Sequence, residues 1–221
     1  MSKTPNVFFT SDHHFGHRNM TEKFVMADGR RVRHEFDSME HCDEEMIKRW
    51  NEVIPPEGKV YHLGDLSFSA QVIDKVLARL NYAEFNLIIG NHDPDDPMTW
   101  VRPKYDTNDG ITRMIGIERK IRKLVSWQFF GPVGEKPVFV ACHYPVHPMC
   151  ITAHHDRGRT IGCLHGHEHR TKVMLEVNGK PSPHEDMRYL NICVENHDYY
   201  PLHYDDVVRL FKKRGIPSYG H

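Results

Sequence analysis

Short, mainly apolar runs alternate with amphipathic stretches along the first 90 residues of the chain. Residues 7–11, 60–64 and 85–90 have the length and the β-branched or aromatic content of buried strands. Between them, residues 36–53 and 69–80 carry apolar side chains at intervals of three and four. This spacing predicts two helices, capped by Asp37 or Ser38 and by Ser69. The strand–helix–strand–helix–strand order predicts an α/β layered fold with right-handed crossovers.

The second half of the chain resumes the strand pattern. Apolar runs at residues 138–142 and 161–164 indicate two more strands, and residues 173–177 and 189–194 are expected to form a hairpin-like pair. Residues 205–214 predict a last helix that ends at Gly215, with basic residues that suit the helix dipole. Residues 94–136 fit either strands or short helices. Because no repeat or linker divides residues 1–221, we expect a single domain.

Five of the predicted strands are followed directly by Asp, Asn or His. The resulting motifs are Asp12-His13-His14, Gly64-Asp65, Gly90-Asn91-His92-Asp93, His143 and Gly166-His167-Glu168-His169. Open sheets place their sites outside the ends of their strands, so these donors should meet at one edge. Asp12 and His14 alternate after a strand and should project to the same face, as should His167 and His169. A polynuclear metal centre is the simplest explanation.

Composition narrows the range of partners. A hydrophobic content of 39% and a charged content of 27% describe an ordinary globular protein, and the formal net charge is −1. There is thus no overall basic field for nucleic acid, and no apolar run approaches the roughly 18 residues of a membrane span. Basic clusters at residues 30–33, 119–123 and 212–214 are interpreted as solvated faces. We therefore expect neither nucleic acid nor a membrane as a partner.

Cysteine and histidine usage adds two further expectations. The five cysteines form no CxxC pair, and the first residues lead into a strand without a secretory signal, so a reducing, cytoplasmic location is expected. Cys142 and Cys163 are interpreted as core residues, because thiolates would select a softer metal. Histidine is unusually frequent, with 18 residues. His62 is interpreted as structural, and His13 should point away from the face of Asp12 and His14.

Taken together, the five motifs resemble the calcineurin-like metallophosphoesterases, in particular the small single-domain members of phages and bacteria. The family pattern D-x-H, G-D, G-N-H-[DE], H and G-H-x-H is complete between Asp12 and His169, in the family's order. The resemblance implies a four-layer αββα sandwich in which two mixed β-sheets are flanked by helices. It also implies a dinuclear metal site at the C-terminal ends of the strands.

The resemblance further divides the donors between two divalent metal ions. The residues that it implies are Asp12, His14, Asp65 and His169 for one ion, and Asp65, Asn91, His143 and His167 for the other. Asp65 would bridge the pair. Mixed imidazole and carboxylate donors accept Mn²⁺, Fe, Zn²⁺, Co²⁺ or Ni²⁺, and Mn²⁺ is the first expectation for activity.

A mechanism follows from the same resemblance. A hydroxide that bridges the two ions would attack phosphorus in line, while His92 protonates the leaving oxygen. Asp93 would orient and charge His92. His17, Asn19 and Tyr144 are candidate substrate contacts. For His17 and Asn19, a turn-forming role after Gly16 is the alternative.

The expected activity is hydrolysis of a small phosphate ester, with nucleotides among the candidates. The resemblance implies a preference for phosphodiesters such as 2′,3′-cyclic nucleotides, because small members of the family, whose short chains have no inserted cap domain and leave an open cleft, often act on diesters. A nuclease or a phosphomonoesterase on the same centre is the alternative among enzymes. A non-catalytic metal-binding scaffold is the alternative of another class.

Overall fold

Two mixed β-sheets form the centre of the protein in a computed structural model, which describes residues 6–94, 101–106, 113–119, 121, 123–125, 127–130, 139–155 and 162–215. The first sheet has the order β13–β1–β2–β3–β6, with bounds Leu202–His203, Val7–Thr10, Lys59–His62, Glu84–Ile88 and Lys123–Val125. The second has the order β12–β9–β8–β7, with bounds Tyr189–Asn191, Gly162–His165, Phe139–Cys142 and Trp127–Phe130. Only β13 and β7 run antiparallel to their neighbours in these two sheets.

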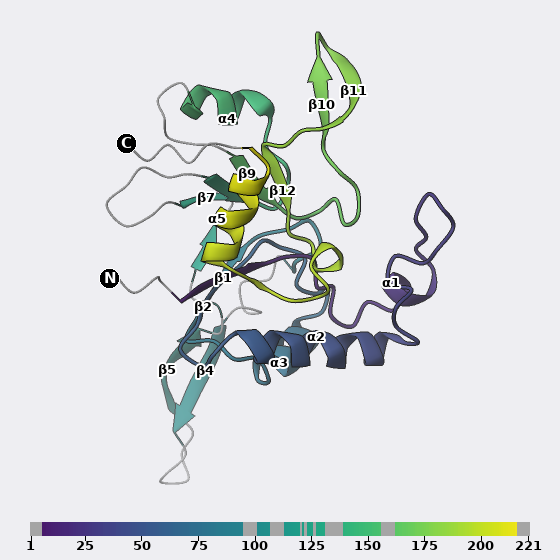
Figure 1. Ribbon diagram of the computed structural model, residues 1–221. Helices are drawn as coiled ribbons and strands as arrows, with labels where there is room; N and C mark the ends of the chain where they lie inside the picture. Colours follow the sequence, from purple (N-terminus) through teal and green to yellow (C-terminus); the bar gives the residue numbers. More distant parts are fainter. Residues whose placement is uncertain are drawn as a thin grey trace.

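The inner faces of the two sheets bury a common apolar core. Phe9 of β1 and Ile88 of β3 share one cluster with Phe139 of β8 and Leu164 of β9. The ring centroids of Phe9 and Phe139 lie 5.7 Å apart. Helix α5 (Tyr204–Lys213) contributes Phe211 to the same cluster and lies beside the sheets in Figure 1. The packing holds the strand ends of both sheets in a fixed relation.

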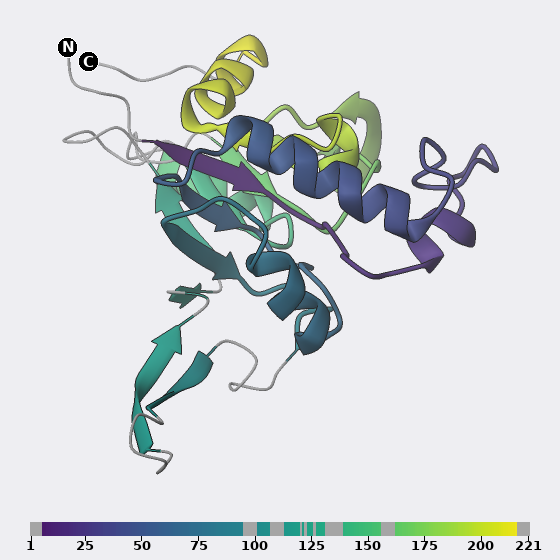
Figure 2. The same cartoon turned by 90° about the horizontal axis from the view of Figure 1, so that it is seen from below.

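Helices α2 (Met39–Val53) and α3 (Ala70–Leu77) cover the outer face of the first sheet, as Figure 2 shows. The side chain of Ser38 accepts a hydrogen bond from the N–H of His41, and that of Ser69 accepts one from the N–H of Val72. Of the two caps predicted for α2, Asp37 or Ser38, the structure shows Ser38, and the prediction of Ser69 is confirmed.

The prediction of a four-layer αββα sandwich is wrong. The described residues contain five α-helices, and one of them, α1 (Asn19–Glu22), is a single turn. The outer face of the second sheet is covered by the eight-residue helix α4 (Pro148–His155), through Ile151, and not by a helical layer. The fold is mixed α/β, with helices concentrated on the first sheet. No helix in the described part of the chain has the length and apolar character needed to cross a membrane.

Two hairpins differ from the sequence prediction. Met174–Val177 (β10) pairs with Lys180–Glu185 (β11), while β12 joins β9 in parallel, so the predicted pairing of residues 173–177 with 189–194 is wrong. In the segment that fitted either type of element, Val101–Asp106 (β4) pairs with Arg113–Arg119 (β5). Figure 1 shows the two hairpins projecting from opposite ends of the body.

Candidate metal centre

The predicted metal ligands lie together where strands of both sheets end. Three groups of side chains have ligand atoms within 4.8 Å of one another: Asp12, His14 and Asp65; Asp65, His143 and His167; and Asp12, His169 and Cys193. Asp65 belongs to two of these groups and Asp12 to two, so the groups form one continuous cluster. Residues that could hold metal ions are thus drawn from segments as distant as residues 12 and 193.

In the first group, a ring nitrogen of His14 lies close to carboxylate oxygens of Asp12 and Asp65. The Nε2 atom of His14 lies 3.9 Å from Oδ1 of Asp12 and 3.5 Å from Oδ2 of Asp65. Both ring nitrogens of His14 are buried without a hydrogen-bond partner. Burial, with Arg33 and His169 nearby, lowers the pKa of this ring well below its usual value, so the ring is neutral at pH 7. A buried neutral imidazole facing two carboxylates fits a cation between them.

The second group has the same character. Nδ1–H of His143 donates to the main-chain oxygen of Leu63 at 2.7 Å, and burial lowers the pKa of the ring to about 4. The neutral ring therefore turns an electron pair on Nε2 toward Oδ1 of Asn91, 3.0 Å away. Nδ1 of His167 lies 3.0 Å from the same oxygen, and Oδ2 of Asp65 lies 3.6 Å from His143 Nε2. These atoms also converge as metal ligands do.

Burial makes the ionised forms of the Asp12 and Asp65 carboxylates less favourable. Burial raises the pKa of Asp12 to about 7, although His169 opposes the shift, and burial also raises the pKa of Asp65. A divalent cation would relieve both effects, because it neutralises carboxylates that have lost their contact with water. The oxygen and nitrogen donors of the cluster therefore fit divalent cations.

The ligands reach the centre by a backbone conformation that the sequence did not predict. Strand β1 ends at Thr10 and β9 at His165, so Asp12, His14, His167 and His169 follow the strands. Their φ angles are 61°, 49°, 67° and 44°, and that of Asp65 is 57°. Strand alternation was the wrong reason for their meeting. Left-handed backbone is costly outside glycine, and such strain concentrates at functional sites.

Two motif glycines allow the main chain to pass against the carboxylates. A Cβ atom on Gly90 would lie 2.2 Å from Oδ1 of Asp65, and one on Gly166 would lie 2.2 Å from Oδ2 of Asp12. Any side chain at either position would therefore displace a ligand of the candidate centre.

Hydrogen bonds fix the orientation of the Asp12 carboxylate. Its Oδ2 atom accepts from the Ser11 hydroxyl, from the N–H of His167 at 2.9 Å and from the Cys193 thiol at 3.2 Å. Oδ1 is the oxygen that faces His14. The roles of Ser11 and Cys193 were not predicted, since both residues lie within runs that resemble core strands.

His92 lies close to the centre, whereas the partners of the Asp93 carboxylate are main-chain groups. The His92 ring centroid lies 5.5 Å from that of His14, close to the centre. The Asp93 carboxylate instead accepts hydrogen bonds from the main-chain N–H groups of Asp65, Leu66 and Gly90, at 2.8–2.9 Å. Asp93 therefore holds the loops that carry Asp65 and Asn91, and its carboxylate is committed to the main chain rather than to the His92 ring.

The candidate substrate contacts are placed differently from one another. The Tyr144 ring is 46% exposed and lies 4.6 Å from the ring of His167, and the His17 ring lies 5.7 Å from that of His14. Asn19 begins α1, where its main-chain oxygen accepts from Lys23, which agrees with the turn-forming alternative.

Phe68 is a residue at the centre that the sequence did not single out. It is 46% exposed, and its ring centroid lies 4.4 Å from that of His92 and 5.9 Å from that of His14. Its place after the Gly64-Asp65 motif was the available signal. An aromatic surface thus borders the centre on the side of His92.

A buried ion pair behind the centre was also missed. Arg33 and Glu195 are 1% and 5% exposed, and Nε of Arg33 donates to Oε1 of Glu195 at 2.9 Å. The interpretation of residues 30–33 as a solvated face is wrong at Arg33. Burial works to raise the pKa of Glu195, but Arg33 and His169 outweigh it and lower the pKa. Both side chains are therefore charged.

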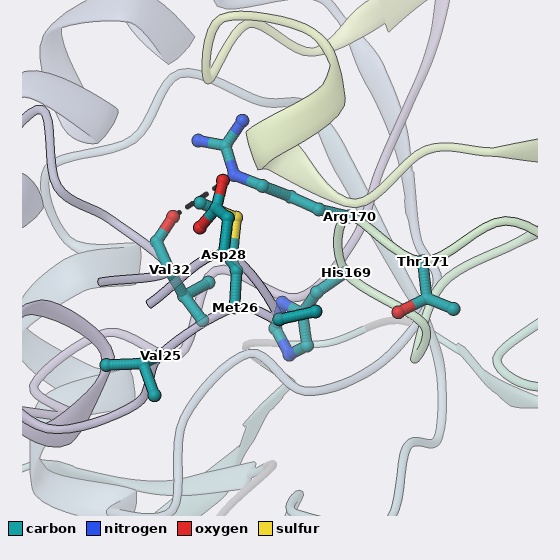
Figure 3. A pocket seen from close by; sticks show the side chains of 8 residues that line it. Val25, Met26, Asp28, Val32, His169, Arg170 and Thr171 are labelled. Carbon is teal, nitrogen blue, oxygen red and sulfur yellow. Dashed lines mark hydrogen bonds between the residues drawn. The ribbon is translucent and has the colours of Figure 1, made fainter. Parts of the chain in front are cut away.

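A cavity of about 450 Å³ opens beside His169 (Figure 3). Val25, Met26 and Val32 line it from one side, and Arg170 and Thr171 line it from the other. The Arg170 guanidinium is occupied, because it donates to the main-chain oxygen of Val32 at 3.1 Å and pairs with Glu35. Asp28 also lines it, so the cavity is a hollow of mixed polar and apolar character next to a candidate metal ligand.

Comparison with known proteins identifies relatives along most of the chain. No family model matches it. An uncharacterized protein of Methanocaldococcus jannaschii is 24% identical over 94% of this chain and 92% of that protein. The Gene 66 protein of Mycobacterium phage L5 is 31% identical over 185 residues, which are 76% of this chain and 80% of the phage protein. The chain belongs to the family of that phage protein.

A solved structure is also similar to this member of the Gene 66 family. The crystal structure of a protein of unknown function from Aquifex aeolicus matches 92% of this chain and 98% of its own, with a TM-score of 0.55 and 19% identity. At this identity the likeness is one of fold alone.

Proposed function

We propose that this protein is a metal-dependent phosphoesterase that hydrolyses phosphodiesters at a centre of two divalent metal ions. The observation that carries the proposal is the convergence of oxygen and nitrogen donor atoms on two adjacent points that share Asp65. The proposed ligands are Asp12, His14, Asp65 and His169 for one ion, and Asp65, Asn91, His143 and His167 for the other. The resemblance of the same motifs to metallophosphoesterases supports this division.

The chemistry divides between the ions and the protein. Two bound divalent ions would supply an acidified water as nucleophile and would neutralise charge on the phosphoryl oxygens. His92 would hold the proton for the leaving oxygen, since its ring lies beside His14 and its main-chain N–H is fixed to Oδ1 of Asp65 at 2.9 Å. Asp93 would keep Asp65 in place through the main chain.

The surroundings of the centre favour a diester. Phe68 and Tyr144 are exposed aromatic rings, one beside His92 and the other beside His167. Arg33 and Arg170 are already paired with Glu195 and Glu35, so neither is free to balance the second negative charge of a monoester. A singly charged diester with planar or apolar substituents suits these neighbours better.

The cavity beside His169 offers a place for one substituent. Val25, Met26 and Val32 give it an apolar side, Asp28 and Arg170 give it a polar one, and its volume lies within the range of small-molecule sites. An ester group next to the ion held by His169 would extend into it. We further propose that the protein works in the cytoplasm, where its five free cysteines would remain reduced.

The test is metal reconstitution. Protein treated with a chelator should cleave neither bis(p-nitrophenyl) phosphate nor p-nitrophenyl phosphate, and Mn²⁺ should restore activity, faster on the diester. Asp12→Asn should abolish the restored activity, whereas Asp37→Asn, whose carboxylate is fully exposed, should leave it unchanged. Failure of Mn²⁺, Fe²⁺, Zn²⁺, Co²⁺ and Ni²⁺ alike would reject the enzyme and favour a binding scaffold.

A further inference from the structure

A single buried guanidinium braces the segment that presents two of the candidate ligands. Nη1 of Arg33 donates to the main-chain oxygen of His13 at 2.6 Å, and Nη2 donates to that of Asp12 at 2.7 Å. The backbone there is left-handed at Asp12 and again at His14. Arg33 therefore binds consecutive carbonyl groups in the segment whose strained conformation aims the Asp12 and His14 side chains at the centre.

The third nitrogen of the Arg33 guanidinium, Nε, is linked through Glu195 to another candidate ligand, His169. Nε donates to Oε1 of Glu195, and the same oxygen accepts from Nδ1–H of His169 at 3.2 Å. With Nδ1 protonated and engaged, Nε2 of His169 is the nitrogen left to bind a metal. One arginine thus connects Asp12 and His14 through the main chain and His169 through Glu195.

The connection reaches one side of the centre. Within the described residues, no hydrogen bond of Arg33 or Glu195 reaches Asn91, His143 or His167. On that side, His143 is oriented independently by the main-chain oxygen of Leu63. Apart from the shared Asp65 and the His167 N–H that donates to the Asp12 carboxylate, the two halves of the centre are supported by different residues.

We propose that the Arg33–Glu195 pair positions the ligands of one of the two metal sites, the site of Asp12, His14 and His169, and sets its affinity separately from the other site. The inference rests on the proposed function in taking the two groups of donors as metal sites. Arg33 and Glu195 are positioning residues, since they act through other residues.

A purely structural role explains the pair less well. Removing two charges from water costs free energy that their attraction barely repays, so a buried pair contributes little to stability by itself. Glu195 also leaves its Oε2 atom buried without a partner. A role in orienting metal ligands explains why the pair is present despite this cost. Mutation of a residue that hydrogen-bonds a metal ligand lowers metal affinity by roughly 10- to 100-fold.

The decisive variant is Arg33→Lys. Lysine keeps the charge beside Glu195, but a single ammonium cannot reproduce the planar fork that reaches two carbonyl groups and a carboxylate. The matched control is Arg49→Lys, since Arg49 also donates to a main-chain oxygen, that of Asp198, and packs near Tyr199. Mn²⁺ binding to chelator-treated protein would be measured by electron paramagnetic resonance and equilibrium dialysis, without substrate.

Single-site backgrounds separate the two sites. In His143→Ala, which leaves the first site intact, we expect Arg33→Lys to weaken Mn²⁺ binding by about 10-fold or more. In His14→Ala, which leaves the second site, the same change should alter binding by less than about twofold. Arg49→Lys should change neither. If Arg33→Lys fails to fold, Glu195→Gln, which keeps the size and one accepting oxygen, should give the same pattern.

Other results would overturn the proposal. Equal weakening of both sites would show a general structural role, and unchanged binding in both backgrounds would show that the pair does not position ligands. Wild-type protein that binds two ions in this pattern but cleaves no ester would reject the proposed function while leaving the positioning role intact. Wild-type protein that binds no ion would reject both.

Discussion

The Asp93 carboxylate accepts a hydrogen bond of 2.9 Å from the main-chain N–H of Asp65. The same carboxylate also binds the N–H groups of Leu66 and Gly90, so it joins the loops that follow β2 and β3. These loops carry Asp65 and Asn91, which belong to the second group of candidate ligands. Asp93 therefore holds together the two loops that carry Asp65 and Asn91.

Replacement of Asp93 by alanine should lower the free energy of unfolding of the metal-free protein by about 3 kcal/mol, because three buried N–H groups lose their acceptor. Urea unfolding in the presence of a chelator would measure the loss. Asp37→Ala, at an exposed carboxylate, is the control and should change stability by less than about 0.5 kcal/mol. An Asp93→Ala protein of wild-type stability with a shifted pH–rate profile would instead restore Asp93 as the partner of His92.

Removal of metal should lower the stability of the wild-type protein but should have little effect on the stability of the Asp65→Asn variant. At a Mn²⁺ concentration 100 times the dissociation constant, each occupied site adds about 2.7 kcal/mol to the free energy of unfolding. Asparagine keeps an oxygen for the main-chain N–H of His92 and removes the negative charge near Asp12. Thermal melts with and without Mn²⁺ should show a shift for the wild type and little for Asp65→Asn. A full shift in the variant would contradict the bridging role.

The sequence was sufficient to find the side chains that cluster, because donor residues directly follow buried strands and parallel strands bring their ends to one edge. It also identified Ser69 and narrowed the other cap to Asp37 or Ser38, because capping depends on neighbouring residues alone. It failed at Arg33, which looks like part of a solvated basic run until Glu195, 162 residues later, is placed beside it. The predicted helical layers failed for a similar reason, since the extent of helix cover on a sheet depends on tertiary packing.

Loss of the His92 ring should slow catalysis and leave metal binding unchanged. His92→Ala removes the proposed proton donor, an effect of about 10²- to 10⁴-fold on kcat. The loss should be larger for an alkyl ester than for a p-nitrophenyl ester, because p-nitrophenolate leaves without a proton. Metal content measured on the same sample is the control. Equal losses for both esters, or lost metal, would exclude His92 as the acid.

Ionisation of the Asp43 carboxyl group should make the free energy of unfolding depend on pH. This side chain of α2 accepts from the N–H of Gly16 at 2.9 Å, and burial raises its pKa from 3.8 to about 6. The folded protein thus holds a proton that the unfolded chain releases, so the free energy of unfolding falls as pH rises from about 4 to 6. The loss is at most about 3 kcal/mol.

Asp43→Asn keeps an acceptor for Gly16 and should lack this part of the pH dependence. The difference in urea stability between the variant and the wild type, measured with a chelator at pH 4.5 to 7, isolates it from other titrating groups. Parallel curves across this range would show that Asp43 ionises normally.

Phe68 should determine which substituents the centre prefers. Its ring lies 4.4 Å from that of His92 and is 46% exposed, so a planar ester group at the centre could stack on it. Stacking on an aromatic side chain is worth about 1–3 kcal/mol, and Phe68→Leu should therefore raise KM for bis(p-nitrophenyl) phosphate about 5- to 150-fold. Methyl p-nitrophenyl phosphate, with one planar group fewer, should be affected less.

The control for Phe68 is Tyr200→Leu, since the Tyr200 hydroxyl donates to Glu52 on α2 and its ring lies near Arg49. This change should leave KM for both esters unaltered. Proportional increases in KM for the two esters in Phe68→Leu would mean that Phe68 supports the fold of the site without selecting the substrate. A change confined to the diaryl ester can arise only from contact with the substituent, because both esters share the same phosphoryl group and the same leaving group.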